Sequence, residues 1–551
     1  MFLTEDLLKG TDWRALERAV ARLAMHCGWE NVSVIGGSGD MGADILATRQ
    51  DNQRNLTWVI QVKAVTGGNY VGVGSVNEAL RAQSVYGTNV AVVATNGDFT
   101  GSARTRCNQL RASGFDVRLW NGAFLRELLL RWPIESFSRR TPREYQEAIS
   151  NRCVAEFLAG ARRVQYVLAT GLGKTLVAAE VVSRLWDRGL RRVLVLCHTQ
   201  ELALQLEQGF WPQLSKDVPT HVFMAGAPPL LGDGVNFGLY QTLLNYAANM
   251  DPSTFDIVVV DEAHHALAHG FRTCIESLQP SLLMGMTATP WRGDGLSIDE
   301  VFGEPIARLS LVDGMNMGYL ARVDYRLYCD NIDWATVHQL SRQRLSVHDL
   351  NKRLFLPQRD EAVAQEVARQ AKELPNPRTI VFCPSVDHAE RFCKFLSSVG
   401  MPAVNLSITD RYERHRRLLL FGSGSISAVT AVDVLNEGID LPNVNMIVFL
   451  RSTHSRRIFV QQLGRGLRIA ADKSVVRVLD FVADIRRMAD VADLGHEVTA
   501  KQSNKEVVYL SEASVSFSNT EARTFVEAWL ADISDLGSIG DDDQLVFPDM
   551  E

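Results

Sequence analysis

Hydrophobic and polar residues follow two different spacings along this chain, and each spacing predicts one kind of element. Near the N-terminus, apolar residues recur on one side of a helix, at Leu16, Val20, Leu23 and Ala24. Residues 255–260, FDIVVV, form a continuous run rich in β-branched residues, which is typical of a strand that is buried on both faces. Because helical and strand patterns alternate along the chain, the sequence predicts an α/β fold.

Around residue 170 the pattern changes from strand to helix across a glycine-rich loop. Apolar residues up to 167 predict a strand, and apolar residues at helical spacing follow Thr175. Such a loop can cradle a phosphate group, because successive backbone N–H groups curl around the anion. Lys174 would reach the β- and γ-phosphates, and the Thr175 hydroxyl would bind Mg²⁺. The alternative is a chance glycine turn. The nucleotide-binding residues expected here are Thr170, Gly171, Leu172, Gly173, Lys174 and Thr175.

Two further groups of residues could complete an ATP site. Asp261 and Glu262 follow the 255–260 strand, and ligands of open α/β sheets bind at the carboxyl ends of strands. Asp261 can hold Mg²⁺, while Glu262 can orient and deprotonate the attacking water. Arg465 and Arg468 lie three apart on an expected helix and can reach one γ-phosphate. The alternatives are a surface acidic turn and a solvent-facing basic helix.

These motifs together resemble a superfamily 2 helicase or translocase of the DEAH-containing branch, which includes the motor subunits of restriction enzymes. The family's motifs occur in order across residues 142–470, and the phosphate loop has Leu168 in place of a first glycine, as this family does. The resemblance implies that Gln146 reads the adenine edge and that residues 286–290 couple hydrolysis to movement. It also implies that Gly438 and Asp440 belong to a motif touching both nucleotide and nucleic acid, and that Arg465 and Arg468 act as arginine fingers.

The resemblance predicts two RecA-like parallel-sheet lobes, at residues 142–312 and 376–504. The phosphate loop lies in one lobe and the arginines in the other, so ATP should close the cleft and hydrolysis should release it. Contacts to a nucleic-acid backbone carry no sequence information, so the motor should tolerate any sequence. Duplex DNA is the favoured partner, with single strands as the alternative. Residues 313–375 are expected to form a connector or a small helical insertion.

The N-terminal region, residues 1–132, carries a second candidate site. Asp44 begins one expected strand, and Gln61 and Lys63 end the next, so these side chains can converge at one end of a hairpin. Asp44 and a backbone carbonyl near Val62 could bind Mg²⁺, which would lower the pKa of a bound water. Lys63 could position that water or stabilise charge in the transition state. By themselves, these residues favour the alternative interpretation, which is ordinary surface charge.

The wider pattern of this region resembles the Mrr-type restriction endonuclease domain, a branch of the PD-(D/E)xK nuclease fold. The match includes G-D-x-G-x-D at 39–44, Q-x-K at 61–63, and a later strand at 90–95 followed by Phe99 and Thr100. Glu17 falls where some members carry an additional acid. Gln61 replaces the second carboxylate of the broad superfamily, as is common in Mrr-like members. The resemblance implies a Mg²⁺-dependent nuclease, with a degenerate DNA-binding module as the alternative.

Composition adds little to these assignments. The net charge is −7, but residues 532–551 hold seven acidic residues and no basic one, so the rest of the chain is neutral. Residues 133–141 are expected to form a stiff linker, and residues 505–551 a polar C-terminal segment with an acidic tail. The tail is expected to be solvated, and the alternative is that it occupies a DNA-binding groove. We expect a cytoplasmic location, because the eight cysteines are scattered and the sequence shows neither a leader nor an apolar run of membrane-spanning length.

The sequence therefore predicts an ATP-dependent DNA translocase or helicase fused to a Mg²⁺-dependent endonuclease. The resemblance suggests a role in prokaryotic restriction or anti-phage defence, with an additional subunit as a possible partner and no membrane association. One alternative is a repair or RNA-remodelling helicase whose N-terminal domain only binds nucleic acid. Another is a non-enzymatic sensor that binds ATP and DNA.

Overall fold

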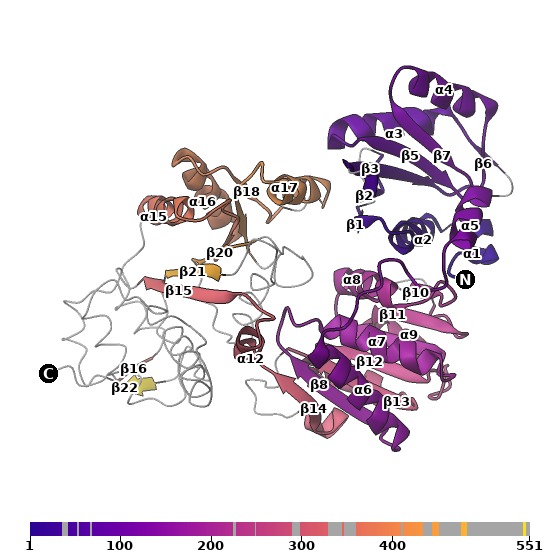
Figure 1. The fold of residues 1–551 in the computed structure, drawn as a ribbon. Coiled ribbons are helices and arrows are strands. Elements are labelled where there is room, and N and C mark those ends of the chain that lie inside the picture. Colours follow the sequence, from indigo (N-terminus) through magenta and orange to yellow (C-terminus); the bar gives the residue numbers. More distant parts are fainter. Residues whose placement is uncertain are drawn as a thin grey trace. The chain divides into compact units, whose positions relative to one another are not determined.

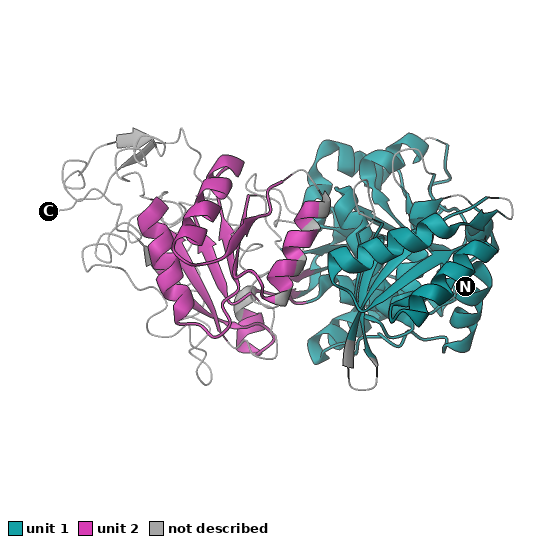
Figure 2. Ribbon diagram, turned by 90° about the horizontal axis from the view of Figure 1, so that it is seen from above, with its two compact units in different colours: residues 1–166, 173–292, 296–307 teal, residues 167–172, 293–295, 308–551 magenta. Residues whose placement is uncertain are grey.

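The computed structural model divides the chain into two compact units (Figure 2). The first comprises residues 1–166, 173–292 and 296–307, and the second comprises residues 167–172, 293–295 and 308–551. The residues that the structure describes are 1–10, 12–35, 42–51, 54–66, 69–223, 228–247, 249–288, 298–328, 344–346, 360–408, 411–432, 444–450, 475–481 and 544–546.

The N-terminal domain is built on a five-stranded sheet in the order β1-β2-β3-β5-β7 (Figure 1). Strands β1, β2 and β3 are antiparallel neighbours, whereas β3, β5 and β7 run parallel. A small parallel pair, β4 with β6, lies outside this sheet. The elements are α1 Glu5–Lys9, α2 Trp13–His26, β1 Glu30–Val34, β2 Ile45–Asp51, β3 Arg54–Lys63, β4 Tyr70–Val71, α3 Val73–Tyr86, β5 Val90–Thr95, β6 Asp98–Phe99, α4 Gly101–Ala112, β7 Asp116–Trp120 and α5 Gly122–Arg131.

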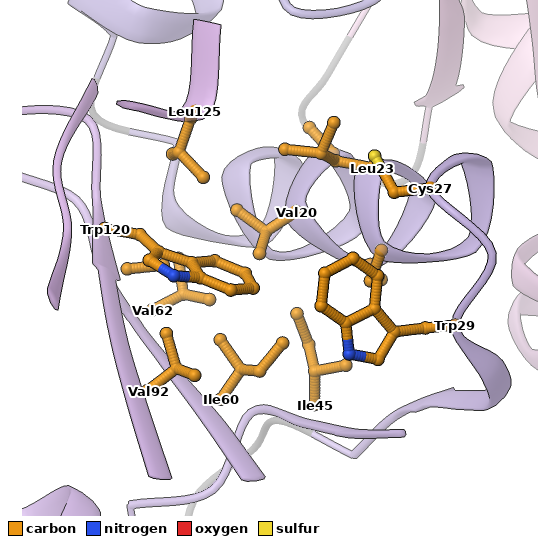
Figure 3. Packing of buried hydrophobic residues seen from close by; sticks show 14 of the residues in the cluster. Val20, Leu23, Cys27, Trp29, Ile45, Ile60, Val62, Val92, Trp120 and Leu125 are labelled. Atoms are coloured by element: carbon orange, nitrogen blue, oxygen red, sulfur yellow. The ribbon is translucent and has the colours of Figure 1, made fainter. Parts of the chain in front are cut away.

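Both faces of this sheet are covered, which explains the continuous apolar run of β5. Val92 joins the cluster under α2, together with Val20, Trp29 and Trp120 (Figure 3). Val93, the next residue along β5, joins a second cluster under α3 and α4. Successive side chains of a strand point to opposite faces, so a strand between two helical layers must be apolar at every position.

The next part of the chain forms a seven-stranded sheet in the order β10-β11-β9-β12-β13-β8-β14. The pairs from β10 to β13 are all parallel. The expected strand at 255–260 is β12, and it lies near the middle of the sheet with every residue buried. The elements are α6 Glu144–Leu158, β8 Arg163–Leu168, α7 Lys174–Trp186, β9 Arg192–Cys197, α8 Gln200–Phe210, the 3-10 helix η1 Trp211–Gln213, β10 Thr220–Phe223, β11 Gly234–Leu239, α9 Tyr240–Ala247, β12 Ile257–Asp261, the 3-10 helix η2 Ala263–Leu267, α10 His269–Glu276, β13 Leu282–Thr287, α11 Asp299–Phe302 and β14 Pro305–Leu309.

The second unit contains a six-stranded sheet in the order β15-β21-β20-β17-β19-β18, and its strands are all parallel. Its core combines one face of the sheet with α15 and α16, around Phe392 and Leu396. The elements are α12 Leu311–Asn316, β15 Arg322–Tyr328, β16 Arg344–Ser346, α15 Asp360–Lys372, β17 Thr379–Phe382, α16 Val386–Ser398, β18 Ala403–Asn405, α17 Arg411–Ser423, β19 Ala428–Ala431, β20 Met446–Phe449, β21 Val475–Phe481 and β22 Gln544–Val546.

Part of the segment expected to be a connector or a small helical insertion contributes a strand to this second sheet. Strand β15 pairs with β21 in register from Arg322 and Val475 to Tyr328 and Phe481, at the edge of the sheet. Its alternating apolar residues did not stand out in the sequence as a strand. Within the acidic tail, the described residues 544–546 form β22, which pairs antiparallel with β16.

Two remaining features concern composition. Among the described helices, none combines the length and apolarity that a bilayer crossing requires. Seven of the eight cysteines lie in the part of the chain that the structure describes, and all seven are free thiols. Six of those seven are buried, where they pack as small apolar residues.

Candidate functional site

The glycine loop lies between β8 and α7, as the sequence pattern predicts. Gly171 and Gly173 adopt φ values of +92° and +82°, a left-handed region in which residues with a Cβ are strained. Gly173 also allows a close approach, because a Cβ there would lie 2.5 Å from Nε2 of Gln146. The loop ends at the N-terminus of α7, where free backbone N–H groups and the helix dipole favour an anion. Helix α7 begins at Lys174, so its first side chain lies at this anion site.

Lys174 meets the acidic residues at the end of β12. Its Nζ lies 2.9 Å from Oε1 of Glu262, and the two side chains are only 13% and 17% exposed. Asp261, the last residue of β12, is buried. Because β13 alone separates β12 from β8, their ends lie about 10 Å apart, a gap that a lysine side chain helps to span. The fold thus brings Lys174 to the neighbouring residues Asp261 and Glu262, although Glu262 lies 88 positions further along the chain.

The two carboxylates occupy opposite electrostatic environments. Burial raises the pKa of Asp261, and the charge of Lys174 offsets this only in part. Burial also acts to raise the pKa of Glu262, but the charges of Lys174 and His264 outweigh it and lower this pKa below its usual range. Glu262 has a left-handed backbone, with φ of 47°. Such strain in a residue with a side chain is frequent at functional sites.

His264 links this acidic pair to the next strand. Its Nδ1 lies 2.9 Å from Oγ1 of Thr287, the last residue of β13, and 3.4 Å from Oε2 of Glu262. The sequence placed Thr287 in a motif that couples hydrolysis to movement, without naming its partner. The structure supplies that partner, because β12 and β13 are adjacent and parallel.

The other expected motor residues fall into two groups. Gln146 is buried on α6, where its Oε1 accepts a hydrogen bond from the backbone N–H of Arg143 at 2.8 Å and its Nε2 faces Gly173. Leu172 is buried, and the Cγ2 of Thr175 faces Gly209 on α8. The remaining expected residues, Gly438, Asp440, Arg465 and Arg468, lie outside the described residues.

In the N-terminal domain, the expected residues converge at one end of the β2–β3 hairpin. Ile45 pairs with Ile60, so Asp44 stands opposite Gln61. The Oδ2 of Asp44 accepts a hydrogen bond from the backbone N–H of Val62 at 2.6 Å. Asp44 and Gln61 are buried, whereas the side chain of Lys63 is 38% exposed. The Oε1 of Gln61 is a buried oxygen without a hydrogen-bond partner.

One residue of this site has no counterpart in the sequence analysis. The Oε2 of Glu78, on α3, accepts a hydrogen bond from Nε2 of Gln61 at 2.6 Å and lies 3.0 Å from Nζ of Lys63. These two donors outweigh the effect of burial and lower the pKa of Glu78. No local pattern marks Glu78, because only the packing of α3 on β3 brings it to Q-x-K. Glu17, the additional acid expected from the resemblance, is buried on α2.

Comparison with known families finds three matching regions along the chain. Residues 8–129 match the Mrr_cat family, which is described as restriction endonuclease. Residues 139–292 match the res subunit of type III restriction enzymes, and residues 358–470 match the helicase conserved C-terminal domain. The chain therefore combines an Mrr-type region with two regions that match helicase-related families, as the resemblance to a superfamily 2 helicase predicts. The expected fold class, an Mrr-type domain before two RecA-like lobes, is confirmed.

Individual curated relatives match part of this chain and part of their own length. The type I restriction enzyme EcoAI endonuclease subunit of Escherichia coli is 25% identical over 399 residues, which cover 64% of this chain and 47% of its own. The EcoKI endonuclease subunit of the same species is 23% identical, over 70% of this chain and 38% of its own. The chain spans about half the length of the curated relatives it matches. Among solved structures, the type ISP restriction-modification enzyme LlaBIII bound to DNA shares the fold, with a TM-score of 0.51 and 15% identity over 94% of this chain and 40% of its own.

Proposed function

We propose that this chain is an ATP-dependent DNA translocase or helicase whose N-terminal domain is a Mg²⁺-dependent DNA endonuclease, acting in prokaryotic restriction or anti-phage defence. The observation that carries the proposal is the Lys174–Glu262 contact at the end of a parallel sheet, in the same chain as Asp44, Gln61 and Lys63. We further propose that the protein is cytoplasmic. We also propose that it acts together with another subunit, since two relatives are named as subunits of restriction enzymes.

We propose the domain bounds that the sequence patterns indicate. These are 1–132 for the nuclease domain, 133–141 for the linker, 142–312 for the first lobe, 313–375 for the inter-lobe segment, 376–504 for the second lobe and 505–551 for the C-terminal segment. Within the inter-lobe segment, strand β15 pairs with β21 of the second sheet.

In the motor, the loop N–H groups and Lys174 would bind the β- and γ-phosphates. Lys174 pairs with Glu262 in this structure. ATP would draw Lys174 to the phosphates, and Glu262 would then lose the cation that lowers its pKa. A carboxylate released in this way becomes a better base toward the attacking water. Gln146 would contact the adenine edge and, from the second lobe, Arg465 and Arg468 would stabilise charge on the γ-phosphate.

The residues present suit Mg²⁺ at both centres. A buried carboxylate whose pKa is raised, such as Asp261, gains from a nearby cation, and Thr175 would supply a hydroxyl. In the nuclease domain, Asp44 and the unpartnered Oε1 of Gln61 are oxygen donors of the kind that this ion prefers. When bound, Mg²⁺ would polarise phosphate oxygens and acidify water. Lys63 would orient that water or stabilise charge on the scissile phosphate.

One experiment tests both activities together. Wild type, Lys174→Ala and Lys63→Ala are compared for ATP turnover and for Mg²⁺-dependent scission on single-stranded, duplex and modified DNA and on RNA. We expect duplex DNA to stimulate turnover, Lys174→Ala to abolish it, and Lys63→Ala to lose scission with turnover intact. If wild type hydrolyses ATP but cleaves none of the nucleic acids, the result would favour a helicase whose N-terminal domain only binds nucleic acid. A wild type that binds but never hydrolyses ATP would favour the sensor.

A further inference from the structure

Glu78 lies beside the Q-x-K residues of the candidate nuclease centre. The Q-x-K motif carries a neutral amide at Gln61, so the hairpin itself supplies only the carboxylate of Asp44. The structure adds the carboxylate of Glu78, which reaches both Gln61 and Lys63 from α3. We propose that Glu78 is the second carboxylate of this centre, and that with Asp44 it binds the divalent cation. This inference rests on the proposed nuclease function.

Charge explains why the centre needs such a residue. Asp44 and Lys63 alone carry one negative and one positive charge, which leaves a divalent cation with no net attraction. Glu78 makes the sum negative. Hard cations bind carboxylate oxygens, and their affinity rises with the number of charged ligands. Gln61 can orient a ligand and contribute a neutral oxygen, but it cannot supply this charge.

The hydrogen bonds hold Glu78 in a defined orientation. Gln61 Nε2 and Lys63 Nζ both reach the same oxygen, Oε2, so Oε1 is not engaged by either donor. Gln61 is 1% exposed and therefore fixed by packing, whereas the side chains of Lys63 and Glu78 are 38% and 45% exposed. A fixed amide thus orients a carboxylate that remains accessible from solvent, as a ligand for an incoming ion must be.

The turn before Asp44 is shaped to fit against Glu78. Gly42 has φ of +85°, and a Cβ there would lie 3.2 Å from Nε2 of Gln61 and 3.3 Å from Cβ of Glu78. A residue with a Cβ would be strained at this φ and would also make tight contacts with both groups. The glycine therefore brings the Asp44 segment, the end of β3 and helix α3 together at one place.

The alternative role for Glu78 is a counter-ion that only neutralises Lys63. The two roles make different predictions for Glu78→Gln, which weakens cation binding only if Glu78 is a ligand, and a variant that moves the charge tests the ligand role further. In Gln61→Glu/Glu78→Gln, the carboxylate returns to the strand and the amide moves to α3. A cation ligand can be moved in this way, because the charge stays at the centre and the hydrogen-bond partners are exchanged. Glu5→Gln is the matched control, because Glu5 forms an exposed helical ion pair with Lys9 in the same domain, at 2.8 Å.

The experiment measures Mn²⁺ binding to the full nucleotide-free chain by calorimetry, for wild type, Asp44→Asn, Glu78→Gln, the double variant and Glu5→Gln. DNA-stimulated ATP turnover serves as the folding control. We expect Glu78→Gln to weaken the Asp44-dependent Mn²⁺ site by about 10-fold or more and the double variant to recover most of the affinity, while Glu5→Gln has no effect. DNA scission should follow the same order.

Two results would overturn the assignment. If Glu78→Gln binds Mn²⁺ as wild type does, Glu78 is only a counter-ion. If the double variant stays as weak as Glu78→Gln, Glu78 acts on the centre through Lys63 and is not a ligand. Failure of the proposed function looks different: wild type then cleaves no DNA and Asp44→Asn leaves Mn²⁺ binding unchanged.

Discussion

The Lys174–Glu262 pair should make the stability and the activity of the motor respond differently to substitution. Lys174→Met removes the ammonium but keeps an unbranched side chain of similar length, so packing changes little. It leaves Glu262 beside Asp261 in a site where both carboxylates are largely buried. Glu262→Gln removes one of these negative charges and keeps the shape.

The size of the effect follows from burial. Removing one partner of a buried ion pair costs about 3–5 kcal/mol, because the other charge stays buried without compensation. With side chains 13% and 17% exposed, this pair lies near the lower end of that range. The double variant Lys174→Met/Glu262→Gln contains neither charge. Its loss in free energy of unfolding should therefore be about 2 kcal/mol smaller than the sum of the two single losses. Recovery stays incomplete, because Lys174 also stabilises the ionised form of Asp261.

Urea unfolding of the four chains without nucleotide or metal measures the cycle. The transition of the first lobe is identified in wild type as the one that Mg²⁺–ATP shifts, since a ligand stabilises the state it binds. ATP turnover should be absent from all three variants. If the free energies lost by the two single variants simply add in the double variant, the pair contributes no coupling and this reasoning is wrong.

Three further predictions concern single positions. Gly173→Ala should weaken binding of a fluorescent ATP analogue about 10-fold, because a left-handed backbone costs a residue with a Cβ about 1–2 kcal/mol and this Cβ would meet Gln146. The control is Gly189→Ala, which has φ of +96° with open space around it and should bind the analogue normally. Thr287→Val keeps the shape but removes the partner of His264, so it should reduce the DNA stimulation of ATP turnover while analogue binding is retained; unchanged stimulation would contradict this. Trp211→Ala should cost about 3–5 kcal/mol in urea unfolding, because this side chain is 2% exposed within the apolar cluster of the N-terminal domain; a loss below about 1 kcal/mol would refute it.

That last side chain shows how the first unit is joined. Trp211 belongs to η1, next to α8 of the helicase part, yet it packs with the core under α2. Nearby, the guanidinium of Arg22 is buried, and it donates to the backbone carbonyls of Val218 at 2.8 Å and Ser215 at 3.1 Å. Arg18 pairs with Glu207 at 3.1 Å. Sequence patterns gave no sign of these contacts, because each partner lies almost 200 residues away along the chain.

The sequence by itself determined the local elements. The glycine loop, the strand that ends at Asp261 and the hairpin with Asp44 and Lys63 could be predicted, because periodicity and glycine conformation depend on neighbouring residues. The family resemblance added the order of the domains. It did not mark β15 as a strand of the second sheet, since an edge strand is defined by the partner it pairs with.

Only the tertiary structure decided which side chains meet. Lys174 contacts Glu262 and His264 contacts Thr287 because the sheet places the ends of β8, β12 and β13 at one edge. Glu78 reaches Gln61 because α3 packs on β3. These contacts join residues from separate elements, and the energy that selects them comes from burying the cores between those elements. The pattern along the chain predicts the elements, but their packing determines which side chains come together in each site.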